Sequence, residues 1–497
     1  MDTGWIMENP CSNIFHFIRK RANIQNLSTI LLLLLLSTMV YAQSISWISS
    51  TESNTWDQAT IKLQNKQEQP SVYVEVTENV NPVTFRAWGA TFNELGWDAL
   101  NMLSDEQQET ILEQLFSPEG DMRFTIGRIP MNANDYARDW YSCDEVDGDF
   151  ELKYFNIDRD KQTLIPYIRK AQGYNPDMTF WISPWSPPSW MKINHHYACQ
   201  KGDHNDLPEE RSVGRLDYDM FVQDSRYLEA YAQYFCKFIN AYKEQGIPIT
   251  AVIYQNEAYS YWTEYPGCSW SAEGTAIFNA DYLAPALARN HPDVGLYFGT
   301  INSNRIDIIE RALANEKFAA NIKGIGLQWE GGQILSQLRK KYPQYSYVQT
   351  ESECGKGTFD WEAAEHTFHL INHYLGNGCE QYTFWNSILS DNGTSGWGWN
   401  QNALIRVDSK AHTAAYTPEY YAVKHYCRYV APGSHLFAYQ SSEENKMPLL
   451  VFLTTENKYV IVAGNLNDIP KTISLKLGDK YLNASLQSHS FNTFIMK

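Results

Sequence analysis

Eight short apolar runs recur between residues 83 and 430 of the 497-residue chain, and stretches with helical periodicity separate them. The runs are rich in β-branched and aromatic residues, which favour strands, whereas the stretches between them place apolar residues on one helical face. Strands that alternate with helices build parallel sheets, so eight such units predict a (β/α)8 barrel of the TIM type over residues 83–430. The predicted strands span residues 84–92, 124–131, 178–185, 249–257, 294–300, 322–329, 345–351 and 381–389.

The segments on either side of the predicted barrel have a different pattern. After Pro432-Gly433 the chain forms short alternating runs, at 449–453, 459–463, 472–477 and 490–496, without helical stretches between them. This pattern is typical of antiparallel strands. Residues 43–82 also contain a strand-like run, at 72–76, that lacks a helical partner. We therefore predict an attached β-sandwich side domain, built from 431–497 together with the strands of 43–82.

The first 42 residues have the pattern of a signal peptide. Arg19, Lys20 and Arg21 precede an apolar run over 27–40, and Val40-Tyr41-Ala42 matches a small-x-small cleavage site. The apolar run is too short for a comfortable membrane span. We expect removal of residues 1–42, a secreted or periplasmic protein, and no membrane insertion afterwards.

Charge and cysteine content narrow the classes of partner. The net charge is −17, which argues against nucleic acid because a phosphate backbone demands a basic face. Aromatic residues make up 14% of the chain, and their rings suit both a large core and a sugar-binding cleft. Seven cysteines follow residue 42 without a CxxC pair, so no zinc site is indicated. One or two disulfides could form, and at least one thiol should stay free.

Two predicted strands end in a glutamate, Glu257 on the fourth and Glu351 on the seventh. Catalytic side chains of such barrels project from the C-terminal ends of the strands. Strands four and seven face each other across the barrel, so folding can bring the two carboxyls to within about 5 Å, the separation typical of retaining glycoside hydrolysis. Glu257 taken alone could equally be a solvated strand-end carboxylate. The pair predicts a β-glycosidase that needs no metal or other cofactor.

The surroundings suggest a role for each carboxyl group. Glu257 would be the acid and then the base, because the charge of Glu351 favours its protonated form. Glu351 would be the nucleophile, and Arg128, near the end of the second strand, would favour its ionised form. Asn256 would bind a neighbouring sugar hydroxyl. Glu353 is a rival for Glu351, because it would share that face if the strand continued.

Several motifs resemble glycoside hydrolase family 30, and the resemblance extends over nearly the whole chain after residue 42. They are Arg128-Ile129-Pro130-Met131 followed by Asp135, the stretch from Ser183 to Lys192, Asn256-Glu257, and the stretch from Thr350 to Gly355. The resemblance implies that Glu257 is the acid/base and Glu351 the nucleophile. It also implies that Asp135, Trp185, Asn256 and Trp385 line the subsite of the non-reducing sugar, and that Trp329 matches an aromatic position of the family.

Departures from the family pattern bear on the substrate. The neighbours of Trp329, Gln328 and Glu330, differ from those in the glucosylceramidases of the family. Residues 392–402 are rich in glycine and tryptophan and look more like its β-1,6-glucanase branch. Trp397 and Trp399 there could be stacking platforms for a glucan chain or buried loop anchors.

The resulting functional prediction is a secreted endo-β-1,6-glucanase that acts on a β-linked oligo- or polysaccharide. The alternatives are an exo-acting β-glucosidase, β-xylosidase or glucosylceramidase on the same scaffold, and a non-catalytic glycan-binding protein. A cluster of His195, His196, Cys199 and His204 fits no ordinary zinc spacing, so it is interpreted as a hydrogen-bonded loop. Oligomeric state is not readable from the sequence.

Overall fold

The computed structural model describes residues 44–442 and 446–496, and the predicted signal peptide lies outside them. Eight parallel strands close into a barrel in the order β10-β11-β4-β5-β6-β7-β8-β9, which confirms the predicted fold class. The strands are β4 (Ala87–Thr91), β5 (Ile126–Met131), β6 (Thr179–Pro184), β7 (Ile249–Ile253), β8 (Gly295–Ile301), β9 (Gly324–Gln328), β10 (Ser346–Glu351) and β11 (Gln381–Phe384).

Two predicted strands are longer than the observed ones. The run at 249–257 forms a strand only to Ile253, and Glu257 has a left-handed backbone with φ 49°, which no strand accommodates. The run at 381–389 covers β11 and the start of β12 (Ile388–Ser390), which belongs to another sheet. In both runs the residues that follow the observed strand, 254–256 and 385–387, are still buried, and burial alone does not distinguish a strand from a buried loop.

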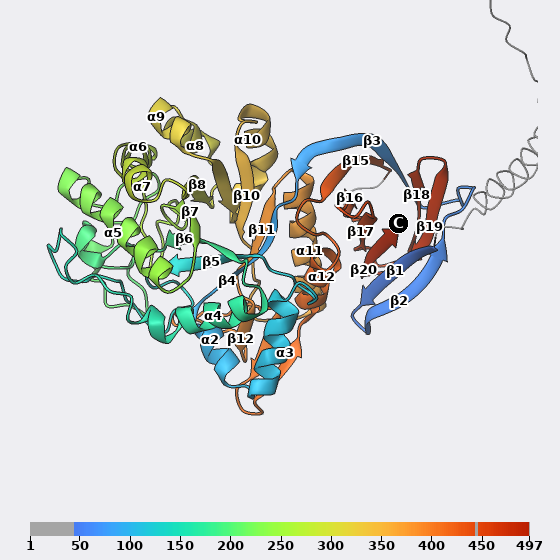
Figure 1. The fold of residues 1–497 in the computed structure, drawn as a ribbon, viewed down its shortest axis with the longest axis horizontal. Coiled ribbons are helices and arrows are strands. Elements are labelled where there is room, and N and C mark those ends of the chain that lie inside the picture. The colour runs from blue at the N-terminus through green and yellow to red at the C-terminus, as the bar shows by residue number, and fades with distance from the viewer. Residues whose placement is uncertain (1–43, 443–445, 497) are drawn as a thin grey trace, which may run out of the picture.

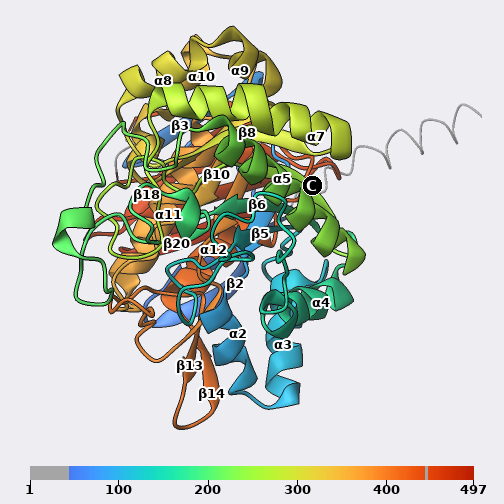
Figure 2. The same cartoon turned by 90° about the vertical axis from the view of Figure 1, so that its left-hand side faces the viewer.

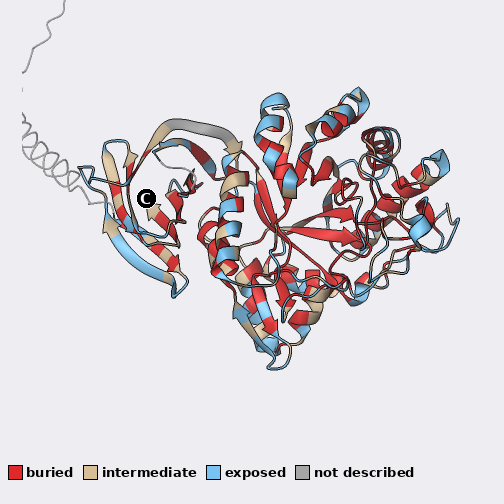
Figure 3. Ribbon diagram, turned by 180° about the vertical axis from the view of Figure 1, so that it is seen from behind, coloured by how far each residue is buried: buried red, intermediate tan, exposed pale blue. Residues whose placement is uncertain are grey.

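Helices surround the barrel with their apolar faces turned inward, and Figure 3 shows buried strands inside helices whose outer faces are exposed. α3, for example, begins after Ser104, whose hydroxyl and backbone exchange hydrogen bonds with Gln107 in a capping box. The helices are α2 (Glu94–Asn101), α3 (Asp105–Phe116), α4 (Leu164–Tyr174), α5 (Ser225–Glu244), α6 (Ala272–Ile277), α7 (Ala284–Asn290), α8 (Ile306–Leu313), α9 (Glu316–Asn321), α10 (Leu335–Lys341), α11 (Trp361–Gly376) and α12 (Pro418–Cys427).

Short turns and a small sheet complete the barrel domain. β12, β13 (Ile405–Asp408) and β14 (Thr413–Tyr416) form the small sheet, whose β13–β14 hairpin lies beside α2 and α3 in Figure 2. Four 3-10 turns, η1 (Asp160–Gln162), η2 (Ser189–Met191), η3 (Glu209–Arg211) and η5 (Trp329–Ile334), and one π-helical turn, η4 (Phe278–Leu283), lie in the connections.

The side domain is a nine-stranded, mostly antiparallel sheet that combines both ends of the described chain, as predicted. Its order is β19-β18-β3-β15-β16-β17-β20-β1-β2. Residues of β18, β19 and β1, from opposite ends of this order, share one apolar core, so the sheet folds over on itself. The strands are β1 (Ser44–Thr51), β2 (Asn54–Lys62), β3 (Val72–Thr84), β15 (His435–Ser441), β16 (Leu449–Leu453), β17 (Tyr459–Asn465), β18 (Lys471–Leu477), β19 (Lys480–Leu486) and β20 (Ser490–Met496).

The outer face of this sheet packs on α11 and α12, which lie between the two domains in Figure 1. Alternation along β17 divides its side chains: Val460 and Val462 join the barrel core, whereas Ile461 joins the core of the side domain. Phe491 of β20 stacks on Phe368 of α11 with ring centroids 4.7 Å apart. The two domains therefore share continuous apolar packing.

Two further observations concern the described residues as a whole. All seven cysteines there are buried and free, so neither of the disulfides that the sequence allowed is formed. No helix in the described ranges is long and apolar enough to cross a membrane.

His425 of α12 forms a fully buried polar link between the domains. Its Nδ1 lies 2.8 Å from the Thr493 hydroxyl, and its Nε2 lies 2.9 Å from the Ser50 hydroxyl. Thr493 donates its own proton to the His425 carbonyl, so Nδ1 is the donor and Nε2 accepts from Ser50. This network needs a neutral imidazole, and burial lowers the pKa of His425 to about 3.

We expect the free energy of unfolding to fall on acidification because of this histidine. Between about pH 6.5 and 3 the unfolded chain binds a proton that the folded chain refuses, which costs about 1.4 kcal/mol per pH unit. Urea unfolding at pH 7, 6 and 5 should show that His425→Asn is less stable at pH 7 but has a shallower pH dependence than the wild type. His195→Asn, at an exposed loop position, is the control. Equal slopes in all three proteins would contradict this prediction.

Candidate active site

Glu257 and Glu351 line the same pocket, at the C-terminal ends of the barrel strands. The pocket has a volume of about 320 Å³. Its lining consists of Asp135, Trp185, Asn256, Glu257, Ser260, Trp262, Tyr265, Asn302, Trp329, Glu330, Glu351, Trp399 and Gln401. A cavity of about 330 Å³ opens at the other end of the barrel, but Asp293 is the one carboxylate among its lining residues. The paired carboxyls therefore point to the first pocket as the functional site.

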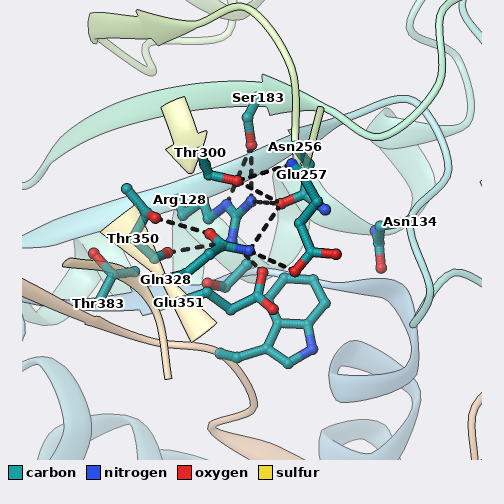
Figure 4. Close-up of polar contacts among 12 residues, drawn as sticks. Arg128, Asn134, Ser183, Asn256, Glu257, Thr300, Gln328, Thr350, Glu351 and Thr383 are labelled. Atoms are coloured by element: carbon teal, nitrogen blue, oxygen red, sulfur yellow. Dashed lines mark hydrogen bonds and ion pairs between the residues drawn. The ribbon is translucent and has the colours of Figure 1, made fainter. Parts of the chain in front are cut away.

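Arg128 of β5 lies at the centre of the polar network in Figure 4 and is fully buried. Its Nη1 donates to Glu351 Oε2 at 2.6 Å, and its Nη2 donates to Asn256 Oδ1 at 2.7 Å. Ser183 and the Thr350 carbonyl accept further hydrogen bonds from the guanidinium. The guanidinium also lies over three tryptophan rings, Trp181, Trp185 and Trp385.

Such an arrangement suits arginine rather than lysine. A buried cation needs a charged partner and acceptors for its donors, and the planar guanidinium provides donors in several fixed directions. Arg128 thereby connects the ends of β6, β7 and β10, and holds Asn256 and Glu351 in fixed positions relative to each other.

Glu257 is partly buried, and its carboxyl accepts two hydrogen bonds. Ser260 donates to Oε2 at 2.7 Å and Gln328 donates to Oε1 at 3.0 Å. Its backbone N–H donates to Thr300 of β8, whose hydroxyl in turn donates to Asn256. Burial and then the charge of Glu351 raise the pKa of Glu257 to about 7, against the opposing effect of the two donors. The carboxyl can therefore hold a proton near neutral pH.

Glu351 is the last residue of β10 and is 6% exposed. Besides the ion pair with Arg128, it accepts a hydrogen bond from Trp329 Nε1 at 3.1 Å. Its rival Glu353 lies beyond the end of the strand and pairs with His366 of α11 at 2.8 Å. Glu353 is also absent from the pocket lining. β10 therefore ends at Glu351, and Glu353 does not continue the strand.

Asp135, Trp185 and Trp385 lie together beside the two glutamates. The rings of Trp185 and Trp385 stack with centroids 5.1 Å apart. Asp135 Oδ1 and Trp385 Nε1 are buried and have no hydrogen-bond partner among the described residues. Burial, and then the charges of Glu351 and Glu257, raise the pKa of Asp135 well above its usual value. Buried polar atoms without partners cost free energy, which a bound hydroxyl would relieve.

Several residues around the two glutamates are not predicted from the sequence as site residues. Gln328 ends β9 and bonds both Asn256 and Glu257, so the strand-end rule that found the glutamates could have found it. The others lie in connections without a periodic signal, and the sequence gives no indication of where they lie. They are Ser260, Trp262, Tyr265 and Asn302.

The two tryptophans of the 392–402 loop differ in their surroundings. Trp397 is 6% exposed and packs with Ala133 and Ala137 below the pocket rim, so it is a loop anchor. Trp399 lines the pocket and lies against Tyr265, with ring centroids 4.7 Å apart. Trp397 is therefore a buried residue of the loop, whereas Trp399 contributes an aromatic ring to the pocket lining.

The loop cluster around His196 is a hydrogen-bonded turn. His196 lies 3.0 Å from Asp206 through Nε2 and accepts the N–H of Ala198 at Nδ1. Within the described ranges no three His, Cys, Asp or Glu residues gather as metal ligands would.

Comparison with protein families identifies the class of protein. Residues 85–430 match the model "Glycosyl hydrolase family 30 TIM-barrel domain", and the chain belongs to this family. It is a glycoside hydrolase, and retention of configuration is general in the family.

Some relatives of this chain are named glucosylceramidase and others endo-1,6-glucanase. "Putative glucosylceramidase 4" of Caenorhabditis elegans is 26% identical over 87% of this chain and 84% of its own length. "Endo-1,6-beta-D-glucanase neg1" of Aspergillus fumigatus is 23% identical over 85% of this chain and 87% of its own. Among solved structures, SrfJ from Salmonella typhimurium has a TM-score of 0.81 at 22% identity, covering 91% of this chain and 99% of its own. The endo-beta1,6-glucanase BT3312 has a TM-score of 0.75 at 20% identity, covering 91% and 98%.

We expect the Arg128 and Glu351 charges to be strongly coupled in stability. Arg128→Met leaves the Glu351 carboxylate buried without its cation, which should cost about 3–5 kcal/mol of unfolding free energy. The double variant Arg128→Met with Glu351→Gln should recover part of that loss, because neither charge remains. Denaturant unfolding of the four proteins measures the coupling. Strict additivity of the two single changes would contradict the prediction.

Proposed function

We propose that the protein is a retaining β-glycosidase in which Glu257 is the acid/base and Glu351 the nucleophile. The observation that carries this proposal is the contrast between two carboxyls on one pocket. Glu351 is paired with a buried arginine, whereas the pKa of Glu257 is raised to about 7. Pairs of carboxyls whose environments differ in this way divide the acid and nucleophile roles between them.

In the first step a Glu351 oxygen attacks the anomeric carbon while the bond from that carbon to the leaving oxygen breaks. Glu257 transfers its proton to the leaving oxygen, so the aglycone departs as a neutral alcohol. Arg128 and Trp329 hold the nucleophile by one hydrogen bond to each of its oxygens. A glycosyl ester on Glu351 results.

In the second step Glu257 removes a proton from water, and the water oxygen attacks the anomeric carbon. The ester bond breaks and Glu351 regains its charge. Glu257 can act as a base at this stage because the ester carries no charge, so one of the two causes of its raised pKa is gone.

The sugar would occupy the pocket between these carboxyls and the stacked tryptophans. Asp135 lines this pocket and offers its carboxyl group to the hydroxyls of the sugar, whereas Trp385 is fully buried and stacks on Trp185, which lines the pocket. Asn256 receives three hydrogen bonds at Oδ1, and no described residue bonds its amide nitrogen, which leaves that donor for substrate. Trp185 offers an aromatic face on the same pocket.

For the substrate we favour internal cleavage of a β-1,6-glucan. Trp262 is 54% exposed and lines the pocket five residues after Glu257. Trp399 and Tyr265 extend this aromatic surface. Relatives named endo-1,6-glucanase in two fungi support this choice.

Glucosylceramide is the second candidate substrate, because relatives named glucosylceramidase have slightly higher sequence identity to this chain than those named endo-1,6-glucanase. A ceramide needs a continuous apolar surface beside the pocket. Of the large apolar side chains that are exposed in the described part of the chain, Trp262 alone lines the pocket. This favours a sugar rather than a lipid as the leaving group.

The signal-peptide pattern of the first 42 residues supports secretion.

The roles of the two glutamates predict a trapped adduct and a defined pH profile. A 2-fluoro β-glucoside with a good leaving group should label Glu351, as peptide mass spectrometry would show. Because the acid must be protonated, kcat/KM for a sugar leaving group should fall as the pH rises through about 7, the pKa of Glu257. A label on Glu353, or turnover without any label, would refute the assignment.

Product analysis tests the substrate. A linear β-1,6-glucan should first give a range of oligosaccharides, and Trp262→Ala should raise KM for the polymer more than for an aryl β-glucoside. Tyr154→Ala, at another exposed aromatic position away from the pocket, is the matched control. Release of glucose alone, or hydrolysis of glucosylceramide with the polymer untouched, would exclude endo-glucanase action.

A further inference from the structure

We propose that Asn302, acting through Ser260, is a positioning residue that keeps the Glu257 proton directed at the glycosidic oxygen. The inference rests on the proposed role of Glu257 as acid/base. It assigns a function to two uncharged loop residues, of which Ser260 contacts the acid and Asn302 contacts Ser260.

Three side chains form a short relay. Asn302 Nδ2 donates to Ser260 Oγ at 2.6 Å, and Ser260 Oγ donates to Glu257 Oε2 at 2.7 Å. The Ser260 backbone N–H also bonds the Glu257 carbonyl at 2.9 Å, so a tight turn holds the hydroxyl beside the carboxyl. Ser260 is 1% exposed and Asn302 is 6% exposed.

The relay fixes the direction of the Ser260 hydroxyl. An amide nitrogen can only donate, so the hydroxyl oxygen must accept from Asn302 and is left to donate its proton to Glu257. Without Asn302 the hydroxyl could rotate and accept a proton from Glu257 instead. Asn302 therefore determines that Ser260 is a donor to the acid.

The other oxygen of Glu257 has a similar neighbour. Gln328 Nε2 donates to Oε1, and the Gln328 carbonyl oxygen is occupied by the Thr350 hydroxyl at 2.8 Å. The amide is thus held with its nitrogen toward Glu257. These two hydrogen bonds are the ones that the described residues make to the carboxyl, and in both Glu257 accepts. Because both neighbours act as donors, neither accepts a proton from Glu257, and that proton stays available to a ligand in the pocket.

Charged and titratable groups also face Glu257, and the relay must be separated from them. They are Glu351 of β10, Arg128 of β5, and Asp135, Tyr265 and Glu330 of the loops around the pocket. Burial and the charge of Glu351 raise the pKa of Glu257, whereas the Ser260 and Gln328 donors and Arg128 lower it. The relay sets where that proton points, which affects leaving groups that need protonation and spares those that do not.

A second observation argues against a purely structural role for Asn302. Its Oδ1 is buried and has no hydrogen-bond partner among the described residues. An unpaired buried oxygen costs free energy, so an amide that only filled space would be better replaced by an apolar side chain.

The test uses aryl β-glucosides whose leaving groups range from 2,4-dinitrophenol to phenol. Their kcat/KM values report glycosylation alone, and the slope against leaving-group pKa reports proton delivery. Asn302→Ala should steepen this slope, with a loss on the order of tenfold or more for phenol and a much smaller loss for dinitrophenol, because general acid catalysis contributes about 10²–10⁴-fold. The basic limb of the pH profile should move to higher pH, because Ser260 no longer donates to the carboxylate.

Ser260→Ala provides the decisive comparison. It removes a donor, but also removes the group that could capture the misdirected proton. We therefore expect a smaller loss than in Asn302→Ala, and the double variant should match Ser260→Ala rather than be worse. Asn304→Ala is the control, since that asparagine is exposed and bonds Gln333 outside the pocket. Thermal unfolding checks each fold, and Asn302→Asp, which keeps the shape but cannot donate when ionised, serves if the alanine variant is unstable.

The outcomes separate this inference from the function on which it rests. If Glu257→Gln steepens the slope but Asn302→Ala and Asn302→Asp do not, the relay is wrong and the acid/base assignment stands. If single losses at Asn302 and Ser260 multiply in the double variant, the directional argument is also wrong. If Glu257→Gln itself keeps the wild-type slope, the proposed function fails first.

Discussion

The structure of the pocket depends on one buried guanidinium. Asp135, Glu257 and Glu351 line one pocket and are poorly solvated, and like charges in such surroundings do not all ionise. Arg128 offers one full positive charge and directs its shortest charged contact to Glu351. The other two carboxyls are left with raised pKa values. The proposed division between nucleophile and acid thus follows from which carboxyl the arginine contacts.

The ends of the barrel strands fix the positions of the charged groups in the pocket. Arg128, Ser183 and Glu351 project from three strands whose spacing is fixed by the parallel ladder, so their mutual positions depend on the barrel and not on loop conformation. Glu257 is different, because it lies four residues beyond β7 with a left-handed backbone. A strained residue persists only where its surroundings over-determine it, and here Thr300 holds the Glu257 backbone N–H.

This difference explains what the sequence could predict. The strands can be predicted from the sequence because buried β-branched runs alternate with amphipathic helices. Arg128, Glu257 and Glu351 can be selected as candidates because each lies at or near the end of such a run. The end of β7 was not readable, since residues 254–256 are buried without being paired in the sheet. Ser260 and Asn302 were not readable either, because their contact joins two loops 42 residues apart and only the folded barrel brings those loops together.

In the proposed mechanism, the two donors on Glu257 have opposite consequences in the two halves of the reaction. By stabilising the carboxylate, Ser260 and Gln328 oppose protonation of the acid, and burial with the charge of Glu351 outweighs them to give a pKa of about 7. Once Glu351 is esterified its charge is gone, and the same donors then favour the carboxylate that must act as base. Without these donors Glu257 would bind its proton more tightly, but it would be a poorer base. The charge of Glu351 is lost on esterification, whereas the hydrogen bonds from Ser260 and Gln328 remain. This combination suits Glu257 to act as acid in the first step and as base in the second.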